Sequence, residues 1–247
     1  MFKLFSRAKS IPLTADFSLL KADMHSHLIP GIDDGSPDLE TSLQLIQRMT
    51  GLGYTKLITT PHIMWGMYRN DRDDILTRLE SLQSAVKAAG IAVEIHAAAE
   101  YFLDEHVEQL LKNNIPLMTI SGNMVLVEFS MALQSMGIKD ILFDMQMKGY
   151  QPVIAHPERY IYLEKNKDFY DELKDIGCLF QLNLLALSGG YGNSVKKLAD
   201  YLIKKEYYDL IGTDLHHHRH IEALQNPVLA VPLARLVASG KIKNNQL

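Results

Sequence analysis

The segment Asp23–Gly35, DMHSHLIPGIDDG, contains two histidines one residue apart and then two adjacent acids. It begins within the β-rich run SLLKADMH, so His25 and His27 are expected at the end of a strand. Side chains alternate across a strand, which puts both imidazoles on the same side. The segment also precedes a helix start, with Ser36 as the expected N-cap and Pro37 at the first helical position. It therefore predicts a strand, a turn and a helix, with candidate metal ligands at the strand end.

The same alternation of strand and helix continues along the chain. Short β-rich runs recur as SLLKADMH, TKLITTPH, IAVEIHAAAE, NMVLVEF, QPVIAH, CLFQLN and YDLIGTD. In the first helix, Leu39, Leu43 and Ile46 are the expected buried stripe. A second helix is expected over residues 71–89, with Ile75, Leu79, Leu82 and Val86 on one face and Gly90 ending it. Further helices are expected near 103–113, 132–148, 166–177, 193–206 and 226–239. This pattern predicts an α/β fold with a closed or nearly closed βα barrel, and an open doubly wound sheet is the alternative.

Length and composition limit the class of protein. The chain has 247 residues, 47% of them hydrophobic and 22% charged, with a formal charge of −4. We expect a single domain over 1–247, with residues 1–19 as an N-terminal extension, and no nucleic-acid surface. The amphipathic start, Met1–Phe5, is expected to be a packed or frayed terminus. We find no signal peptide and no apolar run of about 20 residues, so the expected location is cytoplasmic, with no membrane span.

Residues of metal-binding type follow nearly every expected strand. They are His25, His27, His62, Glu100, Glu128, His156, Asp214 and His216. Each has a simpler explanation when taken alone, such as a buried acid paired with a base for Glu128 or a strand cap for His62. In a βα barrel, however, the carboxyl ends of all strands meet at one rim. The coincidence of so many such residues at the same ends predicts a metal site.

Other histidines and one glycine-rich segment fit this pattern less well. His96 lies in mid-strand and His106 on a helix, so packing or exposed roles are expected. Of the run HHHRH, only His216 shares a side with Asp214, and His217, His218 and His220 are expected at the rim. The segment Gly189–Gly192, GGYG, is expected to be a flexible loop, because it lacks the spacing of a phosphate-binding loop.

The motifs DMHSH, DDG, TTPH, AAE, VEFS, AHPERY and GTDLH resemble, in order, those of the polymerase and histidinol phosphatase (PHP) superfamily. They are most similar to its branch of bacterial manganese-dependent protein-tyrosine phosphatases of capsule and exopolysaccharide systems. The likeness covers about residues 20 to 220. It implies a distorted (β/α)7 barrel with a centre of three metal ions.

The resemblance also implies which residues bind each ion. The three sets are His25, His27, Glu100 and Asp214; then Glu100 as a bridge with Glu128 and His156; and finally Asp34, His62 and His216. Asp33 is expected to be a supporting or turn residue. The mixed imidazole and carboxylate donors suit manganese, iron or zinc, and the resemblance favours manganese.

This ligand set would leave a positive centre. Four carboxylates carry −4 and three divalent ions carry +6, which leaves about +2 for a phosphate dianion. The ions would activate a hydroxide that attacks phosphorus. Arg159 is expected to bind the phosphate, with an ion pair to Glu158 as the alternative role. Arg219 is a weaker candidate for a second arginine.

The expected activity is hydrolysis of phosphotyrosine on proteins, with a tyrosine autokinase of polysaccharide export as the partner. A small-molecule phosphatase, such as histidinol-phosphate phosphatase, is the alternative enzyme. A non-catalytic barrel that serves as a binding module is the alternative from another class. A thiol mechanism is not expected, because the lone Cys178 lies in an apolar segment without a phosphate-binding loop.

Overall fold

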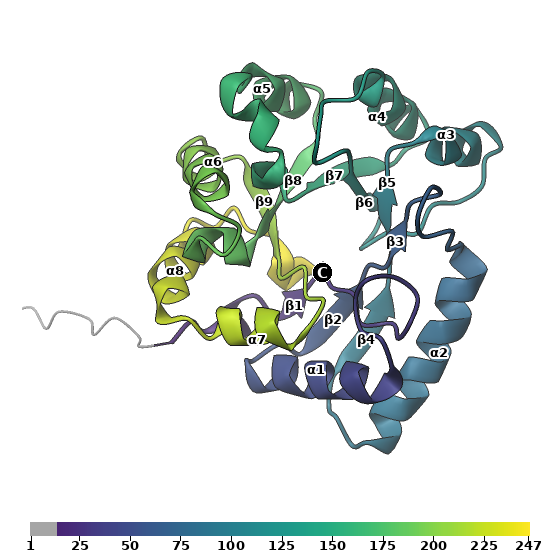
Figure 1. The fold of residues 1–247 in the computed structure, drawn as a ribbon, viewed down its shortest axis with the longest axis vertical. Helices are drawn as coiled ribbons and strands as arrows, with labels where there is room; N and C mark the ends of the chain where they lie inside the picture. The colour runs from purple at the N-terminus through teal and green to yellow at the C-terminus, as the bar shows by residue number, and fades with distance from the viewer. Residues whose placement is uncertain (1–13) are drawn as a thin grey trace, which may run out of the picture.

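The computed structural model describes residues 14–247 and shows strands surrounded by a ring of helices (Figure 1). The expected terminal segment Met1–Phe5, and most of the expected extension 1–19, lie outside the described residues. The strands are β1 Ala22–Asp23, β2 Lys56–Thr59, β3 His62–Ile63, β4 Glu94–Ala97, β5 Glu100–Phe102, β6 Met124–Glu128, β7 Gln151–Ala155, β8 Leu179–Asn183 and β9 Tyr208–Gly212. The α-helices are α1 Leu39–Gly51, α2 Arg72–Ala88, α3 Glu105–Lys112, α4 Ile138–Met147, α5 Asp168–Asp175, α6 Asn193–Lys204, α7 His218–Leu224 and α8 Ala230–Ala238. Short 3-10 helices span Phe17–Leu19, Pro157–Arg159, Ile161–Lys165, Leu184–Ser188, Pro227–Leu229 and Asn244–Gln246.

All strand pairs are parallel, and the strand order is that of a barrel. One sheet has the order β1-β2-β4 and the other β3-β5-β6-β7-β8-β9. β3 continues β2 and β5 continues β4, each after a break of two residues. Backbone hydrogen bonds bridge these breaks, from Ala98 N to Thr59 O at 2.9 Å and from Glu100 N to Pro61 O at 3.1 Å. The nine short strands therefore form the seven expected from the sequence.

The first and last strands meet at a seam beyond their regular ends. The Asp214 backbone N–H donates to the carbonyl of His25, and that of His27 donates to Leu215, both at 2.8 Å. The buried carboxylate of Asp23 accepts both the backbone N–H and the hydroxyl of Thr213. The expected distorted (β/α)7 barrel is confirmed, and the open doubly wound sheet does not fit because β1 and β9 are joined.

The carboxamide of Asn244 joins the same two strands next to this seam. Its Nδ2 donates to the carbonyls of Ala22 and Ile211, and its Oδ1 accepts the N–H of Ile211 at 2.8 Å. In Figure 1 the C-terminus lies near the centre of the ring of helices. The last residues of the chain thus complete the barrel seam.

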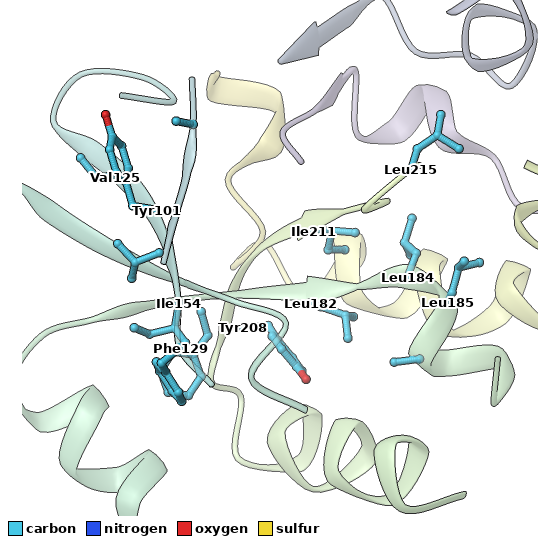
Figure 2. Close-up of a cluster of buried hydrophobic side chains, with 14 of the residues drawn as sticks. Tyr101, Val125, Phe129, Ile154, Leu182, Leu184, Leu185, Tyr208, Ile211 and Leu215 are labelled. Atoms are coloured by element: carbon cyan, nitrogen blue, oxygen red, sulfur yellow. The ribbon is translucent and has the colours of Figure 1, made fainter. Parts of the chain in front are cut away.

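Two apolar clusters make up the core. A small one fills the barrel interior with residues on the strands or next to them: Met24, Ile58, Ala98, Ile120, Leu126, Val153, Ala155 and Leu210. The larger one lies between strands and helices, and Figure 2 shows part of it, including Ile154, Leu182 and Ile211 on β7, β8 and β9. Strands buried on both faces are what a parallel barrel requires.

The start of α1 differs from the expectation. The N-cap is Asp38, whose Oδ1 accepts the Thr41 N–H at 2.8 Å, and not Ser36. The hydroxyl of Ser36 is instead bonded to the carbonyl of Asp38 and to the hydroxyl of Ser42. A carboxylate at the cap accepts a backbone hydrogen bond more strongly than a hydroxyl does. Its negative charge also interacts favourably with the positive end of the helix dipole.

The buried face of α1 also differs from the expectation. Ile46 is buried as expected, but Leu39 is 44% exposed and Leu43 is only half-buried. The buried positions are Ser42, Leu45, Ile46 and Met49.

The other expected helices are present, mostly with shorter bounds. In α2 the buried residues are Ile75, Leu79, Leu82 and Val86, as expected. The helix expected over 132–148 begins only at Ile138, and the one over 226–239 is divided into a 3-10 turn and α8. The sequence did not predict α7, which begins within the histidine run. Among the described helices, none is long and apolar enough to cross a membrane.

Candidate metal centre

The expected ligand residues come together at the carboxyl ends of the strands. Most lie at or just after a strand end, and Asp34 lies in the loop between β1 and α1. Two of them, His156 and Asp214, have left-handed backbones with φ of 33° and 51°. Such conformations are uncommon for non-glycine residues and occur mostly at functional turns. They turn the chain where β7 and β9 end.

The first cluster of donor atoms matches the first expected set. His25, His27, Glu100 and Asp214 each place one ligand atom within 4.8 Å of the others, and all four are buried. Nε2 of His25 lies 3.1 Å from Oε2 of Glu100 and 3.3 Å from Oδ1 of Asp214. Nε2 of His27 lies 3.5 Å from each of the same two oxygens.

Two further clusters share members with the first. His27 joins the expected trio of Asp34, His62 and His216. A third cluster consists of His62, Glu100 and Glu128. His156 was expected with Glu100 and Glu128, but it contacts only the other oxygen of Glu100, at 3.0 Å, and His62 takes its place beside Glu128.

Hydrogen bonds on the outer side fix the tautomers of three histidines. Nδ1 of His25 lies 2.9 Å from Oε1 of Gln181, and Nδ1 of His27 lies 2.7 Å from Oδ2 of Asp33. Nδ1 of His216 lies 2.9 Å from the backbone carbonyl of Asp214. Each partner only accepts, so each Nδ1 carries the hydrogen. The Nε2 of each ring is then free to bind a cation, as in metal-ligating histidines.

The histidine ring nitrogens that face the centre of the cluster lie where a positive charge would stabilise them. Nε2 of His25 and Nε2 of His27 are 3.3 Å apart, and two lone pairs at that distance repel unless a cation or proton lies between them. Nδ1 of His156 is buried without a hydrogen-bond partner, and Nδ1 of His62 faces two carboxylate oxygens, those of Glu128 at 3.1 Å and Glu100 at 3.3 Å. The residues therefore fit divalent cations, since unpaired buried nitrogens are costly and these donor types are metal ligands.

The ionisation of the cluster agrees with this charge balance. Burial alone would lower the pKa of His25, but the facing carboxylates of Glu100 and Asp214 raise it to about 9. Burial would raise the pKa of Glu100, but the imidazoles of His25 and His62 hold it well below its usual range. The carboxylate of Glu100 thus stays ionised and attracts protons or cations.

The turn after His27 brings its supporting residue into place. Asp33, expected in this role, also accepts the backbone N–H groups of Gly35 and His62. Gly35 is required because a Cβ there would lie 2.4 Å from Cβ of His27. The DDG motif therefore folds tightly against the imidazole that it orients.

Arg159 lies at the cluster, and its ion-pair partner is Asp214 and not Glu158. Its Nη1 donates to Oδ2 of Asp214 at 2.8 Å, and its side chain is 29% exposed. It does not pair with Glu158, whose buried carboxylate accepts the N–H of Asn183 and the hydroxyl of Tyr208. Burial raises the pKa of Glu158 to about 7, despite these bonds.

A cavity of about 390 Å³ opens over the cluster. Its polar lining consists of Asp34, His62, Glu100, Glu128, His156, Arg159, Asp214, His216, His217 and His220, and its apolar or aromatic lining of Met64, Met67, Tyr68, Met131 and Tyr191. Polar cation-binding groups and an apolar wall share one opening, which suits a ligand with a charged group on an apolar body.

The other residues of the histidine run differ in their positions relative to the cavity. His217 and His220 line the cavity as expected of rim residues, whereas His218 contacts Arg48 instead. Arg219 is exposed on α7 and does not line the cavity.

The two remaining histidines, His96 and His106, lie outside the cavity. His96 is exposed on β4, and His106 stacks on Trp65 with ring centroids 4.0 Å apart. Both positions agree with the packing or exposed roles expected from the sequence.

Three supporting residues were missed by the sequence reasoning: Gln181, Asn183 and Tyr191. Gln181 accepts from the His25 ring and from the His156 backbone, and its Nε2 donates to Leu182. Asn183 Nδ2 donates to Oδ2 of Asp214 at 2.9 Å. Polar amides in the otherwise apolar strand segment CLFQLN were the signal that could have identified the first two.

Comparison with known proteins identifies a matching family and several relatives with the same kind of name. The model of the family described as capsular polysaccharide synthesis, CpsB/CapC, matches residues 21–229. Tyrosine-protein phosphatase CpsB of Streptococcus pneumoniae is 31% identical over 201 residues, covering 79% of this chain and 82% of that protein. Tyrosine-protein phosphatase YwqE of Bacillus subtilis is 27% identical over 195 residues, covering 79% and 77%.

Solved structures share the fold. One, described as belonging to the metal-dependent tyrosine phosphatases YwqE and CpsB, has a TM-score of 0.75 at 24% identity and covers 89% of this chain and 95% of its own. The lactonase Lmo2620 of Listeria monocytogenes has a TM-score of 0.54 at 10% identity, covering 94% and 92%. Both are similar to this chain in fold.

Proposed function

We propose, since this chain belongs to the capsular polysaccharide synthesis CpsB/CapC family, that it is a metal-dependent phosphatase acting on phosphotyrosine in proteins. The family match confirms the resemblance found in the motifs. The observation that carries the proposal is the group of His25, His27 and His216, whose Nε2 atoms are left free by outer hydrogen bonds. His216 lines the cavity, and the other two rings face Glu100 and Asp214, which also line it. Curated relatives named tyrosine-protein phosphatases support the choice of substrate.

The proposed metal ligands are the nine residues expected from the resemblance. They are His25, His27, Asp34, His62, Glu100, Glu128, His156, Asp214 and His216. We propose three divalent ions, with manganese favoured, as the number and kind that this donor set takes. When bound, such ions supply Lewis acidity toward water and toward phosphoryl oxygens.

The chain's own residues would bind and orient the phosphate. Oδ2 of Asp214 is occupied by Arg159 and Asn183, which leaves Oδ1 facing the imidazoles of the cluster. Arg159 uses Nη1 for this contact and lines the cavity, so its other donors can reach a phosphoryl oxygen. A planar, permanently charged fork suits the three oxygens of a transferring phosphoryl group.

The proposed target is a tyrosine autokinase of polysaccharide synthesis, encountered in the cytoplasm. The apolar wall of Met64, Met67, Tyr68 and Met131 supports an aromatic phosphoester over a strongly polar small molecule. The intact donor set speaks against a non-catalytic module. Cys178 does not support a thiol mechanism, because it is buried and lies outside the cavity lining.

A substrate comparison tests the proposal. Purified protein, with its metal content measured, would be assayed with a phosphotyrosine peptide and with histidinol phosphate, before and after chelation. We expect hydrolysis of the peptide, loss of activity in chelator and recovery best with manganese. A clear preference for histidinol phosphate would favour the small-molecule alternative. Full activity at zero metal content would contradict metal dependence.

A further inference from the structure

The glycine-rich loop Gly189–Gly192 places an aromatic ring in the cavity wall. It joins the 3-10 helix Leu184–Ser188 to α6, and Tyr191 is its residue that lines the cavity. Gly189 and Gly192 have φ of 77° and 93°, a backbone region that favours glycine. The two glycines therefore allow the tight turns on either side of Tyr191.

The ring of Tyr191 lies against the guanidinium of Arg159. Cζ of Arg159 is 4.8 Å from the ring centroid, within the range of cation–π contacts. The hydroxyl of Tyr191 accepts from Nδ2 of Asn183 at 3.1 Å. The same Nδ2 donates to Oδ2 of Asp214, which is the oxygen that Arg159 also contacts. Ring, amide, carboxylate and guanidinium thus form one connected set.

We propose that Tyr191 is a positioning residue that holds the guanidinium of Arg159 in its phosphate-binding orientation. The ion pair of Nη1 with Asp214 fixes one point of a long side chain, which can still turn about that contact. The ring face supplies a second restraint on the plane of the fork, and Asn183 holds the ring in place. The proposal rests on the proposed function, in which Arg159 binds phosphate.

A double-mutant cycle tests this role. Tyr191→Leu removes the ring face but keeps an apolar side chain, and Tyr191→Phe keeps the ring but loses the hydroxyl. We expect Tyr191→Leu to lower kcat/KM for a phosphotyrosine peptide by about two- to thirtyfold, the range of one cation–π contact. Tyr191→Phe loses the hydrogen bond to Asn183 but keeps the ring beside Arg159, so its loss of activity should be clearly smaller than that of Tyr191→Leu. In an Arg159→Ala background, Tyr191→Leu should cause little further loss, because the group that it positions is gone.

Tyr201→Leu is the matched control. Tyr201 also carries a cation over its ring, the amine of Lys167 at 4.8 Å, but it does not line the cavity. Its replacement should leave kcat/KM within about twofold of wild type. Folding by circular dichroism and metal content should be unchanged in all variants. An equal loss from Tyr191→Leu with and without Arg159 would overturn the proposal, because Tyr191 would then act directly on the substrate. No loss in either background would also overturn it.

A second measurement separates this proposal from the proposed function. In a ¹H–¹⁵N spectrum, the side-chain Nε–H signal of Arg159 should be shifted by the nearby ring. The signal is identified because it is absent from the spectrum of Arg159→Ala. We expect it to move in Tyr191→Leu and to stay near its place in Tyr191→Phe and Tyr201→Leu. If wild type does not hydrolyse phosphotyrosine, the proposed function fails, while this signal still reports on whether Tyr191 holds Arg159. A signal unmoved in Tyr191→Leu would overturn the positioning role.

Discussion

Glu100 is the residue on which the clusters converge. Its Oε2 lies 3.1 Å from the His25 ring and 3.3 Å from the His62 ring, and its Oε1 lies 3.0 Å from His156. It is fully buried, so its charge has to be balanced by neighbouring groups: these imidazoles, the His27 ring at 3.5 Å, and the ions that the rings would bind. Its place at a strand end predicts a ligand, and the three-dimensional arrangement supports its expected role as a bridge between ions.

The first prediction separates phosphate binding from metal assembly. Arg159→Ala should keep metal content near wild type, because a guanidinium donates only and cannot be a ligand. Asn183 still holds Oδ2 of Asp214 in this variant. We expect kcat/KM for a phosphotyrosine peptide to fall by roughly ten- to thousandfold, as for the loss of one oriented charge at a developing oxyanion.

Its control is Arg235→Ala, which removes an exposed arginine on α8 and should change kcat/KM by less than about twofold. An Arg159→Ala enzyme with full activity would remove the phosphate-binding role. One that lost its metals would show that Arg159 acts mainly by holding Asp214.

The second prediction concerns Cys178. The thiol is buried, and burial raises its pKa to about 12, so it stays protonated far above neutral pH. Native protein at pH 8 should therefore react with a thiol-specific disulfide reagent only after denaturation. Cys178→Ser should retain nearly full turnover. Rapid labelling of the folded protein, with activity lost in step, would revive the thiol mechanism.

At this scale the sequence could predict residue types and positions but not the residues that support them. Histidine and acid at successive strand ends form a readable pattern, and the structure brings those residues together. Gln181, Asn183 and Tyr191 act through contacts with residues 8 to 156 positions away, which no local pattern records. The exchange of His62 for His156 beside Glu128 likewise depends on side-chain orientation.

Among the helices and strands, the hydrophobic periodicity predicted most elements correctly but placed many of their first and last residues wrongly. The apolar strands were all predicted, because a parallel barrel buries both faces of each strand. The start of α1 was misplaced because Ser36 and Asp38 are both good caps. The hydroxyl of Ser36 is used in local bonds to Asp38 and Ser42, which leaves Asp38 as the cap. α7 was missed because its polar first turn hides the two buried residues Ile221 and Leu224.

The third prediction tests the barrel seam. Asn244→Ala should leave the N–H and carbonyl of Ile211 and the carbonyl of Ala22 without their partner in a buried place. Leaving buried polar groups unsatisfied costs about 1 to 3 kcal/mol each, less what water can recover. We expect the free energy of unfolding, measured by urea denaturation, to fall by about 2 to 3 kcal/mol.

Asn245→Ala is the matched control for this seam, because Asn245 is the next residue along the chain and its side chain is exposed. It should change the free energy of unfolding by less than about 0.5 kcal/mol. Equal effects of the two substitutions would mean that Asn244 contributes nothing specific to joining β1 and β9.

At the scale of the whole molecule, the candidate centre depends on the closed fold. Its ligands come from positions as far apart as His25 and His216, and no two strands alone bring together a complete cluster. An unfolded chain therefore lacks the site. Any ion that binds only the folded chain must then stabilise it, by an amount set by its concentration and affinity.

The last prediction follows from this linkage. Manganese at about one hundred times its dissociation constant should stabilise the chelator-treated protein by about 2.7 kcal/mol for each site filled. For a chain of this size that corresponds to a rise in Tm of about 5 to 10 °C. Calcium should give a smaller rise, because it prefers oxygen ligands to imidazole. His27→Ala should lose most of the manganese shift, since His27 belongs to two of the three clusters. The readout is a thermal melt of each protein in chelator, manganese and calcium, compared as shifts so that any change in intrinsic stability cancels. A manganese shift that persists undiminished in His27→Ala would place the binding site elsewhere on the chain.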